Sequence, residues 1–296
     1  MGNILKIPFD KIRDEGQYKE IFQALERGFT KFGIDFYLVG ATARDVWMKG
    51  VHDLPTKRAT RDIDFGIMIK DSDEFDDLKS YLINEEEFIP VQGNEFVLIW
   101  KDQTQVDLIP FGELEREGVV TVKGAGFTSM NVEGFKEVYE QASEEIETEE
   151  QRFKVCTLPG IVILKLIAWD DRPEERRDDI DDIVEIIKNY FRLNDDQIYE
   201  HHSDLFSDEI ELEEIASQFL GREIGKIISK NPKLTKRIKV ILESGLDESN
   251  DLAELYASES NQTIAYSKNL ISQILKGISD ITIQAIVLWI FSTVYL

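Results

Sequence analysis

Two aspartates stand two residues apart inside an apolar run, in the segment TRDIDFGIMIK. If this run is a β-strand, Asp62 and Asp64 share one face while Ile63 and Phe65 share the other, because successive side chains alternate. The two aspartate Cα atoms would then lie about 6.5 Å apart, a spacing at which two carboxylates can bind one metal site. Like charges this close are unfavourable unless a cation or protons compensate them. The pattern therefore indicates either a metal-binding strand or an edge strand with one solvated face.

A third aspartate follows on another predicted strand. Asp107 lies in QVDLIPF, the second arm of a hairpin predicted over residues 95–111, and its neighbours Val106 and Leu108 face away from it. Carboxylate oxygens are the ligands that Mg²⁺ prefers. Two metal ions about 3.5–4 Å apart could then bind a nucleoside triphosphate and activate an acceptor hydroxyl.

A glycine turn precedes these strands. Gly40 ends the predicted strand DFYLVG and begins a short predicted helix, ATARDVWMKG. Backbone N–H groups exposed there, together with the helix dipole, favour a bound phosphate. A glycine turn or an Asp-x-Asp pair is weak evidence alone. The order strand–glycine–helix, then Asp-x-Asp on a strand, then a later strand aspartate is a much more specific signal.

This order resembles the DNA polymerase β-type nucleotidyltransferase superfamily. The segments LVGATARDVW, RATRDIDFGI, VDLIPFG and LPGIVILKLIAWDDR together resemble a family of bacterial nucleotidyltransferases grouped with AbiEii-type toxins, over residues 35–190. The resemblance implies that Asp62 and Asp64 bind both metal ions, either Mg²⁺ or Mn²⁺. It also implies that Asp107 binds the catalytic ion and helps to deprotonate the acceptor, so these three aspartates are the expected catalytic residues.

The same resemblance places further residues at the nucleotide. Gly40, Ala41 and Thr42 would border the triphosphate, while Arg44 would form either a structural salt bridge with Asp45 or a substrate contact. Two departures from the superfamily pattern concern this segment. Ala41 stands where Gly or Ser is preferred, so a hydroxyl is missing unless Thr42 supplies it. The interval between Gly40 and the first strand aspartate, 21 residues, is longer than usual.

A lone lysine interrupts the apolar run IVILKLIAW. Lys165 must extend its amine to solvent, pair with an acid, or face a cleft. By the resemblance it would hold triphosphate oxygens. The segment RRDDIDDI resembles the family's Lys-Asp-x-x-Asp signature, with Asp178 in place of the lysine. Asp179 would pair with Lys165 or orient the acceptor, and Asp182 is expected to be structural.

Composition limits the partners of the chain. Its 296 residues carry 58 acidic and 34 basic side chains, a net charge of −24, which disfavours nonspecific attraction to nucleic acid or an anionic membrane. A polyanionic substrate therefore needs a local basic patch or metal ions. The single cysteine, Cys156, excludes an intramolecular disulfide and suits a reducing cytoplasm, where we expect the protein to act.

One segment, GREIGKIISKNPKLTKRIK, is clearly basic. Arg222, Lys226 and Lys230 recur at steps of four and would form a stripe on one helix face. The stripe could bind RNA, or it could be a solvated or internally paired face. The neighbouring histidines, His201 and His202, have no further His or Cys close in sequence, so a metal site there is not expected.

The predicted fold class is α+β. Residues 1–150 should form a mixed sheet with flanking helices, and residues 151–296 an all-helical domain that completes the nucleotide and acceptor cleft. The acidic run SEEIETEEQ marks the expected boundary. Predicted helices and further strands lie at 17–32, 73–82 and 118–124 in the first domain, and at 158–170, 177–190, 195–203, 210–220, 222–230, 233–243, 249–257 and 261–276 in the second.

These observations predict a metal-dependent nucleotidyltransferase that moves NMP from an NTP to an acceptor hydroxyl, with tRNA or other RNA as one acceptor. By the resemblance it would be a toxin with a cognate antitoxin. The alternative is a catalytically silent nucleotide- or partner-binding protein on the same fold. A membrane-associated structural protein would rest only on residues 281–296, an uncharged stretch shorter than the ~20 residues of a spanning helix. A buried terminal helix or an association surface is the expected role of that stretch.

Overall fold

The computed structural model describes residues 4–12, 17–55, 62–101, 104–148, 151–207, 209–247 and 251–294, with the backbone alone at residues 10, 12, 17 and 282–294. Two compact units divide the chain, Met1–Ile161 and Val162–Leu296. The division falls later than the boundary expected near residue 150. The acidic run instead supplies a strand, because its alternate residue Ile146 is fully buried in the sheet.

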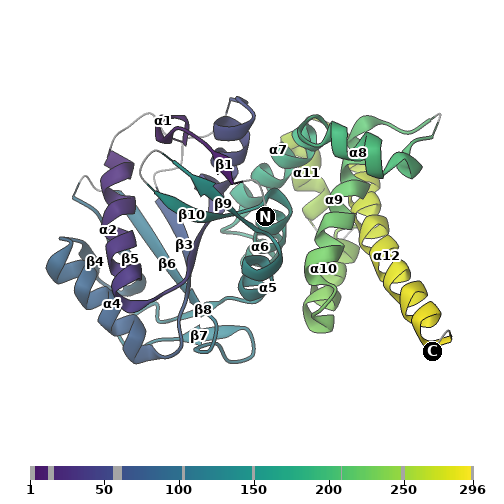
Figure 1. Ribbon diagram of the computed structural model, residues 1–296. Helices are drawn as coiled ribbons and strands as arrows, with labels where there is room; N and C mark the ends of the chain where they lie inside the picture. The colour runs from purple at the N-terminus through teal and green to yellow at the C-terminus, as the bar shows by residue number, and fades with distance from the viewer. Residues whose placement is uncertain are drawn as a thin grey trace. The chain divides into compact units, whose positions relative to one another are not determined.

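Unit 1 is built on an eight-stranded mixed sheet, in the order β1-β9-β10-β2-β3-β6-β5-β4 (Figure 1). The pairs β1/β9, β10/β2 and β3/β6 are parallel, and the remaining neighbours are antiparallel. The strands are β1 (Leu5–Lys6), β2 (Phe36–Val39), β3 (Asp62–Met68), β4 (Ile89–Val91), β5 (Asn94–Ile99), β6 (Gln105–Phe111), β9 (Ser143–Glu147) and β10 (Arg152–Cys156). A separate two-stranded sheet holds β7 (Val119–Thr121), which confirms the strand predicted at 118–124, and β8 (Ser129–Asn131).

The predicted hairpin is confirmed as the antiparallel pair β5/β6, in which Val97 faces Asp107. Its turn residues 102 and 103, like residues 56–60 of the loop expected between Gly40 and the aspartate strand, lie outside the described residues. The helices that begin in unit 1 are α1 (Phe9–Ile12), α2 (Gln17–Phe32), α3 (Gly40–Asp45), α4 (Ser72–Glu85), α5 (Phe135–Gln141) and α6 (Leu158–Asp171).

Helices α2 and α4 lie side by side over one face of the sheet (Figure 1). The apolar face predicted for α2 packs there, since Phe22 contacts Phe65 of β3 with ring centroids 5.2 Å apart. Phe29 contacts Phe36 of β2 at 4.4 Å. Such aromatic packing removes large apolar areas from water and fixes this face of β3 as the buried one. The aspartates of β3 therefore belong to the opposite face.

Unit 2 is helical, as predicted. Beyond α6 it contains α7 (Arg177–Leu193), α8 (Asp195–His201), a 3₁₀ turn (Ser203–Leu205), α9 (Leu212–Ile228), α10 (Pro232–Ser244), α11 (Leu252–Ser260) and α12 (Ile264–Val294). The break expected near residue 221 is wrong, because α9 runs through it. Gly221 serves close packing instead of a turn: a Cβ there would collide with the backbone carbonyl of Ile274 in α12. Gly277 of α12 has the same relation to the carbonyl of Gln218, so the two helix backbones are nearly in contact.

Helix α12 extends the helix predicted at 261–276 through most of the uncharged C-terminal stretch. Over the residues up to 281 it packs along α9, and its Leu270, Ile271, Ile274 and Ile278 are buried. In the part of the chain that the structure describes, no helix combines the length and apolarity that crossing a membrane requires.

Candidate active site

Strands β3 and β6 bring two of the predicted aspartates together. The strands are parallel and in register, so that Asp64 pairs with Asp107 and Asp62 pairs with Gln105. Paired residues of neighbouring strands project from the same face of a sheet. All four side chains are half-buried, whereas the alternating residues of both strands are fully buried. The three aspartates therefore share one face of the sheet, as the alternation predicted.

Gly40 lies against the carboxylate of Asp64. Val39, the last residue of β2, pairs with Asp64 in the antiparallel ladder, and Gly40 then begins α3 with φ +66°. This left-handed conformation costs little only for glycine. A Cβ at this position would collide with Oδ2 of Asp64. The glycine requirement at this turn thus has a direct cause in the aspartate site.

A Gly40→Ala substitution should lower the free energy of unfolding by about 1–2 kcal/mol for the left-handed backbone, and further for the collision with Asp64. Gly33→Ala is the matched control, because Gly33 has φ +67° but an added Cβ there would meet no atom within 4 Å. Urea unfolding measures both variants. A loss in Gly40→Ala no larger than in Gly33→Ala would contradict the close approach to Asp64.

The other residues of α3 are anchored within the protein. The Thr42 hydroxyl, on a side chain that is 2% exposed, donates to the backbone carbonyl of Asp62 at 3.1 Å. This hydrogen bond fastens α3 to the start of β3, so the Thr42 hydroxyl is already engaged within the protein. Ala41, the residue before it, is half-buried. Arg44 is 1% exposed, and its Nε and Nη2 both donate to Oδ1 of Asp45, at 3.0 and 2.7 Å. Of the two roles considered for Arg44, this geometry favours the structural salt bridge.

The donor set of the face suits a hard divalent cation, since it offers three carboxylates on two adjacent strands. The pairing of Asp64 with Asp107 in the backbone register is compatible with one ion bound by both strands. The side chains as they stand do not enclose one: among the described residues, no three His, Cys, Asp or Glu side chains are arranged to hold a metal. Asp107 Oδ1 accepts a hydrogen bond of 2.7 Å from Nε2 of Gln105. Gln105 is not among the site residues predicted from the sequence, although it stands two residues before Asp107 and therefore on the same strand face.

Lys165 of α6 forms a buried ion triad with α7. Its Nζ lies 2.7 Å from Asp179 Oδ1 and 2.6 Å from Asp182 Oδ2. Burial opposes the charge of the amine, but the two aspartates more than offset it, so the pKa of Lys165 is raised and the amine stays protonated. Of the described buried side-chain atoms, Asp179 Oδ2 is among the few without a hydrogen-bond partner. The two short distances confirm the predicted pairing of Lys165 with Asp179 and show that Asp182 belongs to the same cluster.

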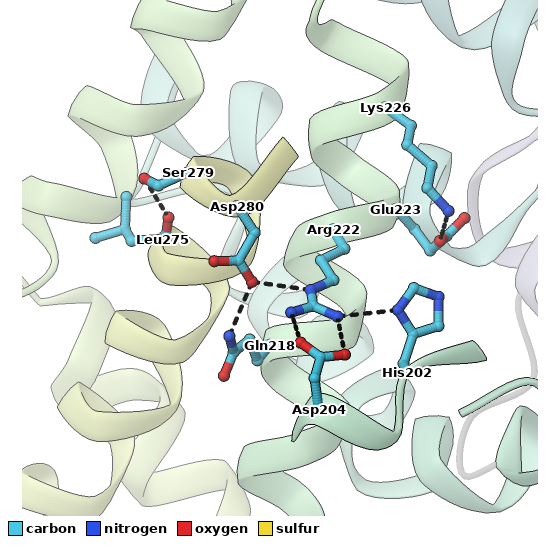
Figure 2. Close-up of polar contacts among 9 residues, drawn as sticks. All are labelled: His202, Asp204, Gln218, Arg222, Glu223, Lys226, Leu275, Ser279 and Asp280. Carbon is cyan, nitrogen blue, oxygen red and sulfur yellow. Dashed lines mark hydrogen bonds and ion pairs between the residues drawn. The ribbon is translucent and has the colours of Figure 1, made fainter. Parts of the chain in front are cut away.

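Arg222, Lys226 and Lys230 do not form the expected exposed basic stripe, because Arg222 is buried. Its guanidinium donates to both oxygens of Asp204, at 2.9 and 2.5 Å, and to Asp280 of α12 at 2.8 Å (Figure 2). The ring of His202 lies 3.0 Å from Nη1, and burial followed by the Arg222 charge lowers the pKa of this histidine. Lys226 pairs with Glu223 at 2.5 Å. Internal ion pairing, the alternative to RNA binding, therefore holds for Arg222.

Cys156, the single cysteine, is fully buried at the end of β10. Burial raises the pKa of its thiol well above the usual value, so the nucleophilic thiolate is suppressed. The backbone carbonyl of Cys156 accepts a hydrogen bond of 2.7 Å from the indole of Trp47. Cys156 is thus a core residue and not part of the site.

The glycine turn followed by in-register strand aspartates is the arrangement expected of a nucleotidyltransferase, and the sequence comparison agrees with that class. Residues 23–257 match the family described as "Nucleotidyl transferase AbiEii toxin, Type IV TA system". The match spans most of the chain, and the chain belongs to the AbiEii nucleotidyltransferase family.

Similarity to individual proteins is low. No curated protein matches the sequence significantly. A solved structure of an antigenic nucleotidyltransferase-like protein from Paracoccidioides brasiliensis shares 14% identity with a TM-score of 0.39, covering 78% of this chain and 93% of that one. The CD-NTase CdnG of Bradyrhizobium diazoefficiens, solved in complex with GTP, shares 13% identity with a TM-score of 0.27, covering 93% and 86%.

Proposed function

We propose that this chain transfers a nucleoside monophosphate from an NTP to an acceptor hydroxyl, with Asp62, Asp64 and Asp107 as the ligands of Mg²⁺ or Mn²⁺. The in-register pairing of Asp64 with Asp107, with Gly40 packed against Asp64, is the observation that carries this proposal. Three carboxylates on one sheet face are electrostatically costly without a cation, so their retention on one face supports a metal site over a silent fold.

In the proposed reaction the acceptor oxygen attacks the α-phosphorus of the NTP. A bond from the acceptor oxygen to phosphorus forms as the bond from phosphorus to the leaving pyrophosphate breaks. Asp107 would help to take the proton of the acceptor hydroxyl, and Asp62 and Asp64 would hold the divalent ion. When bound, a divalent ion supplies neutralisation of phosphate charge and lowers the pKa of the attacking hydroxyl. The backbone at Gly40 and Ala41 would border the outer phosphates.

The direct test is label transfer. The purified chain would be incubated with each of the four NTPs, labelled at the α-phosphate, in Mg²⁺ or Mn²⁺, with total RNA and with protein as acceptors. Label in one acceptor fraction, dependent on metal and absent with NTP labelled at the γ-phosphate, is the expected result. Nucleotide binding without any transfer would instead support the silent binding protein.

RNA, tRNA included, is the acceptor class that we place first, and the basic segment, residues 226–239, is the surface that supports it. These residues include six lysines and arginines and no acid, in a chain whose net charge is −24. Helix α10 carries most of them, and Arg237 fastens it to the end of α6 by an ion pair of 2.5 Å with Asp171. Lys233 and Lys236 are exposed on α10, one turn apart. Phosphates of a bound strand would release counterions at such a surface.

Reversing Lys233 and Lys236 to Glu should reduce transfer to RNA at least about tenfold near 0.1 M salt, because at low salt each phosphate contact contributes to affinity through counterion release. The slope of log affinity against log salt should fall by about 1.4, for two contacts to a single strand. Filter binding of RNA across a salt series measures both quantities.

The matched control reverses Lys268 and Lys276 of α12, which changes the net charge by the same amount outside the basic segment. NTP binding should be equal in both double variants. If the α12 variant loses RNA affinity to the same extent, the effect is one of overall charge, and the acceptor is then more consistent with a protein or small molecule.

The family's description as a toxin of a toxin–antitoxin system supports a toxin role with a cognate antitoxin. Under this proposal, transfer to the acceptor inactivates a molecule that growth requires, and the antitoxin opposes that effect.

A further inference from the structure

Four half-buried polar side chains form a two-by-two block on the face of β3 and β6 that carries the aspartates. Asp62 and Asp64 lie on one strand, and Gln105 and Asp107 lie directly opposite them on the other. Three members are aspartates, and the fourth is a neutral carboxamide. The carboxamide is therefore the one member of the block that can donate a hydrogen bond to a carboxylate.

The carboxamide of Gln105 donates its hydrogen bond to another member of the block. Gln105 Nε2 donates to Asp107 Oδ1 at 2.7 Å, along the strand and not across it. An aspartate has two side-chain torsions, and its second is broadly distributed unless a contact fixes it. A ligating carboxylate that is itself hydrogen-bonded is oriented for the metal, and removing such a partner commonly weakens metal binding by about 10–100-fold.

We infer that Gln105 is a positioning residue of this site: its amide orients the Asp107 carboxylate toward the ion that Asp64 also binds. The inference rests on the metal site of the proposed function. It predicts that removing the amide, with the volume of the side chain kept, weakens metal binding without unfolding the protein. Gln105→Met makes this change, because methionine is unbranched and similar in length but cannot donate.

Calorimetric titration of Mn²⁺ into metal-free protein tests the inference. The apparent Kd should rise at least about tenfold in Gln105→Met, with the melting temperature nearly unchanged. Raising Mn²⁺ in proportion should restore transfer in this variant, a rescue that a purely structural defect would not show. Gln23→Met is the matched control, since Gln23 is a half-buried glutamine of α2, the helix that covers the opposite face of the sheet.

Asp64→Asn, titrated alongside, separates the two proposals. Weak Mn²⁺ binding in both Asp64→Asn and Gln105→Met, with Gln23→Met normal, supports the role of Gln105. Weak binding in Asp64→Asn alone leaves the metal site standing and overturns the role of Gln105. Equal weakening in Gln105→Met and Gln23→Met also overturns the role of Gln105. Unchanged binding in all three variants overturns both the role of Gln105 and the metal site.

Discussion

Asp64→Asn should reduce nucleotide transfer by about three orders of magnitude while leaving the protein folded. The substitution keeps the size of the side chain but removes one of the two charges that meet across β3 and β6. Loss of a metal ligand removes several kcal/mol of transition-state stabilisation. Since each 1.36 kcal/mol is tenfold in rate, we expect kcat to fall by about 10³-fold. Stability should be unchanged or slightly higher, because the like-charge repulsion with Asp107 is relieved.

Transfer of labelled NMP and thermal unfolding measure the two effects in the same preparations. The growth of cells that express each chain tests the toxin proposal. Expression of the wild-type chain should arrest growth, and expression of Asp64→Asn should not. Asp77→Asn, at an exposed position on α4, is the control for loss of one charge from unit 1. Full activity in Asp64→Asn, or equal loss in Asp77→Asn, would contradict the assignment of the site.

Lys165→Met should cause the largest loss of stability of any single substitution proposed for unit 2. Lys165 and its two partners are nearly buried, with side-chain exposures of 11%, 9% and 9%. Without the ammonium, Asp179 and Asp182 lose the positive charge that lies between them. Breaking a buried ion pair in this way costs about 3–5 kcal/mol, and urea unfolding would measure the change.

Replacing all three members, as Lys165→Met with Asp179→Leu and Asp182→Leu, should restore most of the lost stability, because the two neighbouring carboxylates are removed together with the lysine. Lys226→Met breaks an exposed pair with Glu223 and should have a far smaller effect, since solvent screens that pair. A triple variant as unstable as Lys165→Met would show that packing, and not charge, dominates at this cluster.

The Lys165→Met variant also tests whether Lys165 contacts the nucleotide. Phosphate oxygens would have to compete with two carboxylates already bound to Lys165. If Lys165 holds the outer phosphates, Lys165→Met should weaken NTP binding more than NMP binding at a temperature where the variant stays folded. Equal weakening for both nucleotides would leave Lys165 with the structural role that its two ion pairs already indicate.

The sequence by itself determined the features that depend on neighbours along the chain. Strand alternation placed Asp62 and Asp64 on one face, and the hairpin pattern placed Asp107 on a strand, because side-chain direction in a strand follows from residue parity alone. The apolar period of α2 similarly predicted its buried face. The order of these motifs, with Gly40 before them, was sufficient to indicate the nucleotidyltransferase class.

Tertiary structure alone decided the partners of residues that are distant in sequence. The sequence predicts that Arg222 is part of a basic stripe, yet Arg222 is buried and forms ion pairs with Asp204 and Asp280. Gly221 reads as a helix break, yet the approach of α12 requires a glycine within a continuous helix. Local sequence cannot encode either outcome, because the cost of burying a charge or of adding a Cβ depends on which remote atoms lie within a few ångströms. The register that sets Asp64 beside Asp107 was decided at the same level.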